Sequence, residues 1–406
     1  MGLAKRRSWG TGTTYGIADP ALVEVLGMST FSGETVNECT ALNLSAIYRA
    51  VSLIAGSIAT LPLRSVESDD QGRKTRKSSW LDNPYGPDYE KTQYEWVETV
   101  VANLVLHGNA FLFKLFNGAG AMVGGIPIHP SCVEVEVDDT KPGKRLYKVN
   151  TDDNGVLELT NAEILHIPGL SFDGVRGYSL LYLARNSIGI ALAGDKSAGA
   201  VLKNGPKHSV LITPNEDLTE EEAEAVTDSV RNAMAGPDNA GKIISINRAL
   251  SLSPFTMSYA DAQFLETRVF QIEEIARWTG LPPHLLGLTE KQTSFGTGVA
   301  EQNLGLSRFT LNPITSRIEQ RLSRLLGPKV KAEFDYSGFL RPAPTDEITL
   351  VIAEMNAGLI TPNEARAIRN MPAIEGQDEL RLPPGSLPPG QMEGEQIEEE
   401  NSQAGE

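Results

Sequence analysis

The clearest hydrophobic pattern in the chain lies between residues 259 and 287. Apolar residues recur there in steps of four, three and four, at Leu265, Val269, Ile272 and Ala276. This spacing places all four on one face of a helix, so we expect them to form a buried stripe. Gly280 and the two prolines that follow stop the pattern. We therefore predict a helix over 260–279.

Other segments also have helical patterns. A second long helix is predicted over 179–204, where Gly205 and Pro206 end it. A helix that ends at Pro62 has a predicted buried face of Ile47, Val51, Ile54 and Ile58, and further helices are expected over 94–106, 219–233, 345–357 and 362–370. A third long helix, about 299–326, contains Pro313. Proline removes a backbone hydrogen bond and clashes with the preceding turn, so we expect a kink there.

Short apolar runs between turn residues predict strands. They lie at Phe111–Phe116, Met122–Ile128, Val133–Val137, Tyr147–Val149, Ile164–Ile167, Val210–Ile212, Ile243–Ile246 and Val330–Phe334, with a further hairpin around 69–72. Asn117 and Gly118 form a turn between the first two. The elements predict an α+β protein with mostly antiparallel pairing.

The two ends of the chain have compositions that favour disorder. Residues 1–36 are rich in glycine, threonine and serine and are expected to form a flexible arm. Residues 376–406 are rich in proline, glycine and glutamate and are expected to form a disordered acidic tail. The formal net charge is −16. A chain this acidic is not expected to grip nucleic acid phosphates over a broad surface.

The sequence contains no recognisable catalytic or metal-binding motif. The five histidines and two cysteines match no metal-ligand spacing; they are His107, His129, His166, His208, His284, Cys39 and Cys132. The glycines of 118–124 lack the spacing of a nucleotide-binding loop, and no Gly-x-Ser-x-Gly elbow occurs. We therefore expect no metal, no cofactor and no enzymatic activity.

Nothing in the sequence indicates a membrane protein. No apolar run follows the basic residues at 5–7, so no secretory signal is predicted. The longest nearly apolar stretch, 178–202, carries Arg185, Asp195 and Lys196. Charges near the middle of a span are costly, so this helix is expected to belong to a soluble protein.

Several blocks of sequence, taken in order, carry a family resemblance. The helix over 260–279 contains Asp261-Ala-Gln-Phe-Leu-Glu266 and Ile275-Ala-Arg277, and Leu281-Pro-Pro-His-Leu-Leu-Gly287 follows. Six other blocks are Ala46–Leu63, Leu81–Pro84, Val105–Phe111, Glu163–Pro168, Gly177–Leu181 and Gly236–Lys242. In this order they resemble the portal protein family of tailed double-stranded DNA bacteriophages, of the long-tailed type.

The resemblance implies a portal fold and a division of the chain into its parts. These are a wing (37–178), a stem helix (179–204), a small α/β clip (205–257), a second stem helix (258–280), a continuation of the wing (281–340) and a helical crown (341–375). It also implies a dodecameric ring at a capsid vertex, which conducts double-stranded DNA during packaging and ejection. The implied partners are the terminase large subunit, the major capsid protein with scaffold, and a head–tail connector protein. The implied location is the virion, and the host cytoplasm during assembly.

Acidic residues on the helix over 260–279 are the first candidate site. They are Asp261, Glu266, Glu273 and Glu274. One interpretation is an ordinary solvated face, with a Glu273–Arg277 pair four residues apart. By resemblance, such helices line the DNA channel, where carboxylates would repel phosphates and keep the duplex sliding.

The loop 289–298 is the second candidate site. By resemblance it is the tunnel loop that narrows the channel, with Lys291, Gln292, Thr293, Ser294 and Phe295 near DNA. Polar side chains there would touch the backbone without reading bases. The other interpretation is an ordinary surface loop.

Two alternatives belong to other functional classes. One is a monomeric adaptor or scaffold protein with an acidic tail. The other is an enzyme with an unrecognised hydrolase site, for instance one that uses His166 and Asp173.

Overall fold

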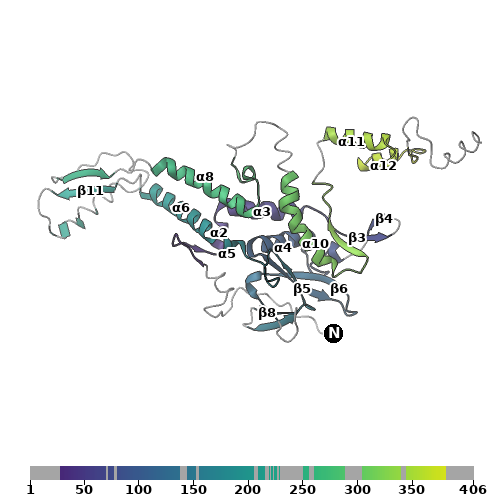
Figure 1. Cartoon of the computed structure of the whole chain (residues 1–406), viewed down its shortest axis with the longest axis horizontal. Coiled ribbons are helices and arrows are strands. Elements are labelled where there is room, and N and C mark those ends of the chain that lie inside the picture. The colour runs from purple at the N-terminus through teal and green to yellow at the C-terminus, as the bar shows by residue number, and fades with distance from the viewer. Residues whose placement is uncertain are drawn as a thin grey trace, which may run out of the picture. The chain divides into compact units, whose positions relative to one another are not determined.

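The computed structural model describes much of the 406-residue chain (Figure 1). The described residues are 28–69, 72–76, 80–137, 144–151, 155–204, 209–214, 219, 221–222, 224–225, 228, 250–255, 260–288, 304–339 and 344–380. The chain divides into two compact units, Met1–Asp335 and Tyr336–Glu406. None of the described helices is long and apolar enough to cross a membrane.

Two helices form the centre of the first unit. α3 (Ser45–Ala59) packs against α4 (Gln93–His107). All four apolar residues of the predicted stripe, Ile47, Val51, Ile54 and Ile58, are buried. Thr92 caps α4 in a reciprocal box with Glu95, and Gly108 ends it in the left-handed conformation. Both helices confirm the sequence prediction.

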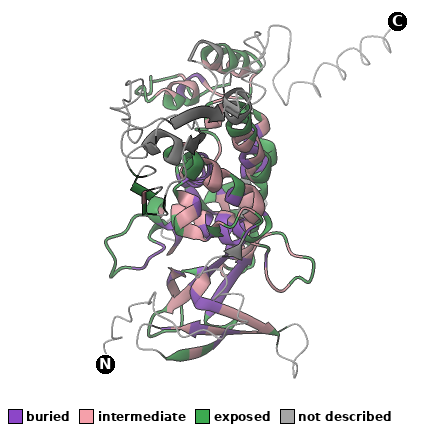
Figure 2. Ribbon diagram, turned by 90° about the vertical axis from the view of Figure 1, so that its left-hand side faces the viewer, coloured by how far each residue is buried: buried purple, intermediate pink, exposed green. Residues whose placement is uncertain are grey.

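Two antiparallel three-stranded sheets share a core below these helices. One has the order β10 (Ile164–Pro168), β5 (Asn109–Phe116), β6 (Met122–Ile128), and the other has β7 (Val133–Val137), β8 (Arg145–Asn150), β9 (Val156–Thr160). Phe111 and Ile164 of the first sheet pack with Tyr147 and Val149 of the second. Figure 2 shows the buried residues on these strands. We did not predict β9, of which only Leu159 is buried.

A third sheet joins distant parts of the chain. Its order is β13 (Val330–Phe334), β3 (Leu63–Asp69), β4 (Gly72–Thr75), all antiparallel. The β3–β4 hairpin and the bounds of β13 agree with the prediction. α10 (Asn312–Ser323) packs on β13. The chain after residue 281 therefore returns to the elements formed by its first hundred residues.

The two long helices lie side by side and run in opposite directions (Figure 1). α8 (Ala260–Thr279) has the predicted bounds. The helix predicted over 179–204 is instead two pieces, α5 (Leu180–Leu183) and α6 (Arg185–Asn204), with a break at Ala184. Ala184 is neither glycine nor proline, so the local sequence gave no signal for this break.

A network around Asn109 anchors the start of this helical segment. The Asn109 amide nitrogen donates to the carbonyl oxygens of His107 and Gly177, both at 2.9 Å, and its oxygen accepts from the Gly177 N–H at 2.8 Å. Gly169 N–H donates to Gly108 O at 2.7 Å. Asn109 is fully buried. The end of α4, the start of β5 and the chain leading into α5 are therefore fixed to one another.

Between the long helices, two strands are described. β11 (Ser209–Pro214) pairs with β12 (Leu250–Phe255) in antiparallel register. β11 includes the predicted strand Val210–Ile212, whereas β12 was not predicted. The predicted strand at 243–246 lies outside the described residues. For the helix predicted over 219–233, the Thr219 N–H donates to a Glu222 carboxylate oxygen at 3.2 Å, which is one of the two bonds of the expected capping box.

The flexible arm predicted over 1–36 is too long at its C-terminal end. Residues 28–36 form a small hairpin of β1 (Met28–Ser29) and β2 (Thr35–Val36), in which Thr30 is buried. The Phe31 N–H donates to the Asn186 side chain on α6 at 3.3 Å. Contacts with a residue 155 positions away order this segment, and its local composition gives no sign of them.

The second unit contains two helices with the predicted positions. α11 (Pro344–Asn356) precedes α12 (Pro362–Ile368), and Thr361 caps α12 in a box with Glu364. The described chain continues to residue 380, beyond the predicted start of the disordered tail at 376. The Asn363 side chain explains the difference, because it bonds to the Ile374 backbone and to Asp378 at 2.8 Å.

Candidate functional site

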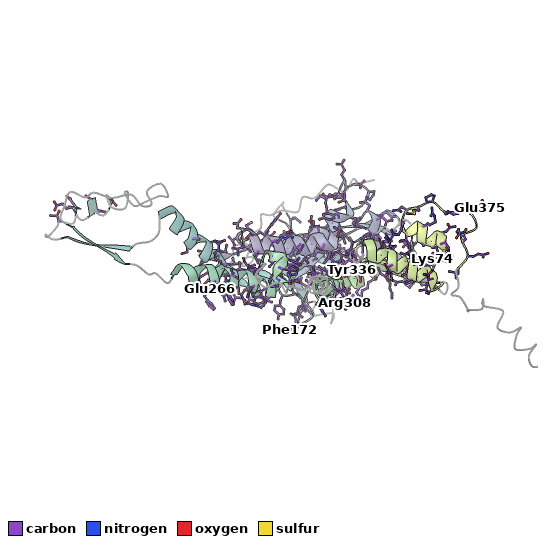
Figure 3. The ribbon with its side chains drawn as sticks, turned by 90° about the horizontal axis from the view of Figure 1, so that it is seen from above. Lys74, Phe172, Glu266, Arg308, Tyr336 and Glu375 are labelled. Carbon is purple, nitrogen blue, oxygen red and sulfur yellow. The ribbon has the colours of Figure 1, made fainter. Side chains whose placement is uncertain are left out.

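The acidic residues of α8 lie in two different environments. Glu266 is exposed on α8 (Figure 3). Glu273 and Glu274 flank the Arg277 guanidinium, with a Glu273 Oε2–Arg277 Nη1 distance of 4.0 Å and a Glu274 Oε1–Arg277 Nε distance of 2.9 Å. Such half-exposed pairs contribute a few tenths of a kcal/mol to stability. Each half of α8 therefore carries one net negative charge, from Asp261 and Glu266 against Arg268 in the first half and from Glu273 and Glu274 against Arg277 in the second. The side chain of Asp261 is outside the described set.

Polar contacts hold α8 to α6. Arg268 Nη2 lies 2.8 Å from Asp195 Oδ1, and Trp278 Nε1 donates to Ser187 Oγ at 3.3 Å. Because the partner number falls from 195 to 187 as the α8 number rises from 268 to 278, the helices are antiparallel. Arg268 thus pairs with an acid on α6, and Glu266 stays available to solvent.

The predicted stripe of α8 is only partly buried. Ala276 and its neighbour Ile275 are buried, whereas Val269 is 38% exposed. Three larger apolar side chains on the helix pair are also exposed, namely Phe270 (51%), Trp278 (41%) and Ile190 (44%). The prediction of one continuous buried face is wrong at Val269, because the first half of α8 extends past the core elements that cover its second half.

The loop 289–298 lies outside the described residues. The roles predicted for Lys291, Gln292, Thr293, Ser294 and Phe295 therefore remain predictions. The chain before the loop ends in the short helix η4 (Pro283–Leu286), closed by Gly287 in the left-handed conformation.

The helix after the loop changes its winding just before Pro313. Residues Leu306–Leu311 form a π-helical turn, η5, and α10 follows with Pro313 at its start. A π-turn inserts an extra residue into the hydrogen-bond ladder and is found where helices bend. The kink predicted at Pro313 remains a prediction, and this local irregularity supports it.

The structure gives the two residues of the alternative hydrolase site different hydrogen-bond partners. His166 is 3% exposed; its Nε2–H donates to Asn109 Oδ1 at 3.0 Å, and its Nδ1 accepts from Arg145 at 3.1 Å. Asp173 accepts from the Ser171 hydroxyl at 2.7 Å and from the Val175 N–H at 2.8 Å. His166 therefore belongs to the Asn109 network, and Asp173 stabilises its own loop.

Acid should destabilise the fold through His166. Burial, together with the nearby charge of Arg145, lowers the pKa of His166 from 6.5 to about 3. The unfolded chain takes up a proton near pH 6.5, but the folded chain does not, so this stability is complete above pH 6.5 and is lost as the pH falls towards 3. We expect a loss of at most about 1.4 kcal/mol per pH unit from this residue.

Urea unfolding between pH 7.5 and 5.0 measures this effect. His166→Gln should be less stable at pH 7.5 but should lose less stability on acidification. An equal pH slope in both proteins would show that His166 does not carry the effect.

One cluster of possible metal ligands was missed by the sequence analysis. Glu38, at the start of α2 (Glu38–Leu42), His107 and His129 place one ligand atom each within 4.8 Å of one another. Hydrogen bonds from His107 and His129 lower the pKa of the Glu38 carboxyl far below its ordinary value. Glu38 and His129 are 91 positions apart, so no motif spacing marks the cluster.

Comparison with known proteins identifies the family. The family model described as "Phage portal protein" matches residues 45–370. The probable portal protein of Streptomyces phage phiC31 is 33% identical over 380 residues, which cover 90% of this chain and 83% of that protein.

Two solved structures have the same fold. The portal protein of an HK97 family phage from Corynebacterium diphtheriae has a TM-score of 0.57 at 18% identity, covering 76% of this chain and 98% of that one. A chain from the neck of a native gene transfer agent particle, computed with C12 symmetry, has a TM-score of 0.54 at 22% identity, covering 82% and 92%. The predicted α+β portal fold is thereby confirmed, and the chain belongs to the phage portal protein family.

Proposed function

We propose that twelve copies of this chain form a ring at one capsid vertex, through which double-stranded DNA is packaged and later ejected. The twelvefold symmetry of the gene transfer agent neck supports this number. Closed rings are the ordinary result of a head-to-tail interface whose rotation closes. The assembled ring belongs to the virion, and its subunits are made in the host cytoplasm.

The observation that carries this proposal is the set of side chains that the α6–α8 pair exposes in a single chain. The pair exposes Phe270, Trp278 and Ile190, and it exposes the carboxylate of Glu266. Neighbouring copies would cover these apolar side chains, because three large apolar side chains exposed on one helix pair indicate an interaction surface. Carboxylates left on the inner side would face DNA and repel its phosphates, so the duplex would slide without being trapped.

The role in DNA movement is passive. The sequence has no phosphate-binding loop, so the ATP-driven work falls to a separate terminase large subunit that docks on the ring. The segment 205–257 would contact the terminase and later the head–tail connector, and the outer surface would contact the major capsid protein and scaffold. The loop 289–298 would narrow the channel around the duplex.

Deletion of the gene from the genome that encodes it tests this function. We expect the host to produce heads without DNA and without tails, and plasmid-borne wild-type protein to restore both. Heads that package DNA normally without the chain would contradict the proposal.

An acidic side chain at Phe270 should prevent ring formation. Phe270→Glu would place a charge in an apolar subunit contact, where desolvation is costly. We expect mostly unassembled subunits on size-exclusion chromatography. Phe116→Glu is a matched control, because Phe116 is also 51% exposed but lies at the end of β5. Equal assembly of the two variants would place the interface elsewhere.

A further inference from the structure

We infer that Glu38, His107 and His129 form a binding site for a divalent transition metal of the zinc type. The three side chains converge on a single point. Glu38 Oε2 lies 3.3 Å from His107 Nε2 and 2.9 Å from His129 Nε2. Tetrahedral Zn²⁺ with bonds of about 2.0–2.2 Å places neighbouring ligand atoms about 3.3–3.5 Å apart. The observed spacing therefore needs only small side-chain shifts to admit the ion.

Three different elements hold the ligands in place. Glu38 opens α2, behind the Asn37–Thr40 capping box; His107 is the last residue of α4; and His129 lies between β6 and the 3-10 turn η2 (Pro130–Cys132). The two imidazole rings meet edge to face, with centroids 5.0 Å apart and planes at 74°. Ligands on the ends of regular elements are held more precisely than ligands on loops.

The donor set selects the class of metal. Two imidazole nitrogens and one carboxylate oxygen suit Zn²⁺ and its neighbours Co²⁺ and Ni²⁺, whereas Mg²⁺ and Ca²⁺ prefer oxygen ligands alone. A metal on His129 Nε2 requires the ring proton on Nδ1. The Ser131 hydroxyl oxygen lies 2.6 Å from that Nδ1 and can accept a hydrogen bond from Nδ1–H, which would replace the bond of 3.3 Å that Nδ1 accepts from the Ser131 backbone N–H in this structure. Such an outer partner fixes the orientation of a metal-binding imidazole.

The cluster is buried on one side and open on the other. The His107 side chain is 2% exposed, whereas the side chains of His129 and Glu38 are 41% and 37% exposed. An ion can therefore reach the ligands from solvent, and a water molecule or another group can complete its coordination. Glu38 Oε2 accepts a hydrogen bond from His129 at 2.9 Å and lies 3.3 Å from His107 Nε2, so the metal would replace protons in an existing contact between α2, α4 and the end of β6.

Zinc titration of the full-length protein tests the site. Protein stripped with a chelator is titrated with ZnCl₂ by calorimetry, and CoCl₂ is added separately to record its visible spectrum. We expect one Zn²⁺ per chain, a tetrahedral-type Co²⁺ spectrum and a higher thermal midpoint with zinc. Glu38→Gln and His129→Ala should each weaken zinc binding about tenfold or more.

Two substitutions serve as controls for other zinc ligands. Cys39→Ser removes the exposed thiol next to Glu38, and His284→Ala removes a histidine of η4. Both should bind zinc as the wild type does. Circular dichroism shows whether each variant is folded. If Glu38→Gln or His129→Ala does not fold, His129→Asn is used as the ligand variant in its place. Absence of stoichiometric binding, unchanged binding after Glu38→Gln and His129→Ala, or loss of binding with Cys39→Ser would each overturn the assignment.

Discussion

Replacement of Gly177 with alanine should destabilise the protein by about 3 kcal/mol or more, enough to remove most soluble native chain. A Cβ atom at Gly177 would lie 2.0 Å from the Gly108 carbonyl oxygen and 2.6 Å from the Gly169 nitrogen. Both are main-chain atoms, joined by a hydrogen bond of 2.7 Å. Neither can move without disturbing the Asn109 network that fixes the start of α5.

Gly118→Ala is the matched control for this substitution. Gly118 lies in the loop between β5 and β6, and no atom lies within 4 Å of its would-be Cβ. We expect its free energy of unfolding to stay within about 0.5 kcal/mol of wild type. Soluble yield and urea unfolding of both variants measure the difference. A Gly177→Ala protein as stable as the control would show that the three backbone segments are not tightly joined.

Glu266→Lys should slow DNA packaging on the order of tenfold, because each subunit would change from repelling phosphates to binding them. In a ring of twelve the substitution changes the channel charge in every copy. Glu266 is a better position for this test than Glu273 or Glu274, because those two carboxylates share the Arg277 guanidinium, which offsets one of their two charges. Packaged DNA per head, followed over time, is the measurement.

Salt and a second substitution distinguish electrostatics from misfolding. Added salt should restore part of the packaging rate of Glu266→Lys, since it screens lysine–phosphate attraction. Glu90→Lys makes the same charge change on an exposed residue before α4 and should package normally. Packaging by Glu266→Lys at the wild-type rate would refute the electrostatic role of the α8 carboxylates.

Local signals explain what the sequence predicted well. The apolar steps of α3, the Gly-Leu-Pro-Pro that ends α8, and the Thr361–Glu364 box of α12 act within a few residues. Each therefore marks an element boundary or a buried face without knowledge of the rest of the fold. The order of the sequence blocks along the chain indicated the family, although no single block would have done so.

Contacts between distant residues explain what the sequence missed. Nothing near Asn109 reveals that it will bond to Gly177, and nothing near His129 reveals that Glu38 will face it. Val269 has the correct spacing for a buried stripe, but its burial depends on how far the neighbouring elements extend along α8. Tertiary position, rather than local pattern, decided these cases.

The mass of the native assembly tests the proposed ring most directly. The protein released from heads assembled in its host can be measured by native mass spectrometry. Twelve copies of a 43.9 kDa chain should give a closed species of about 527 kDa. A single 43.9 kDa species, or an open series of oligomers with no preferred size, would contradict a dodecameric channel.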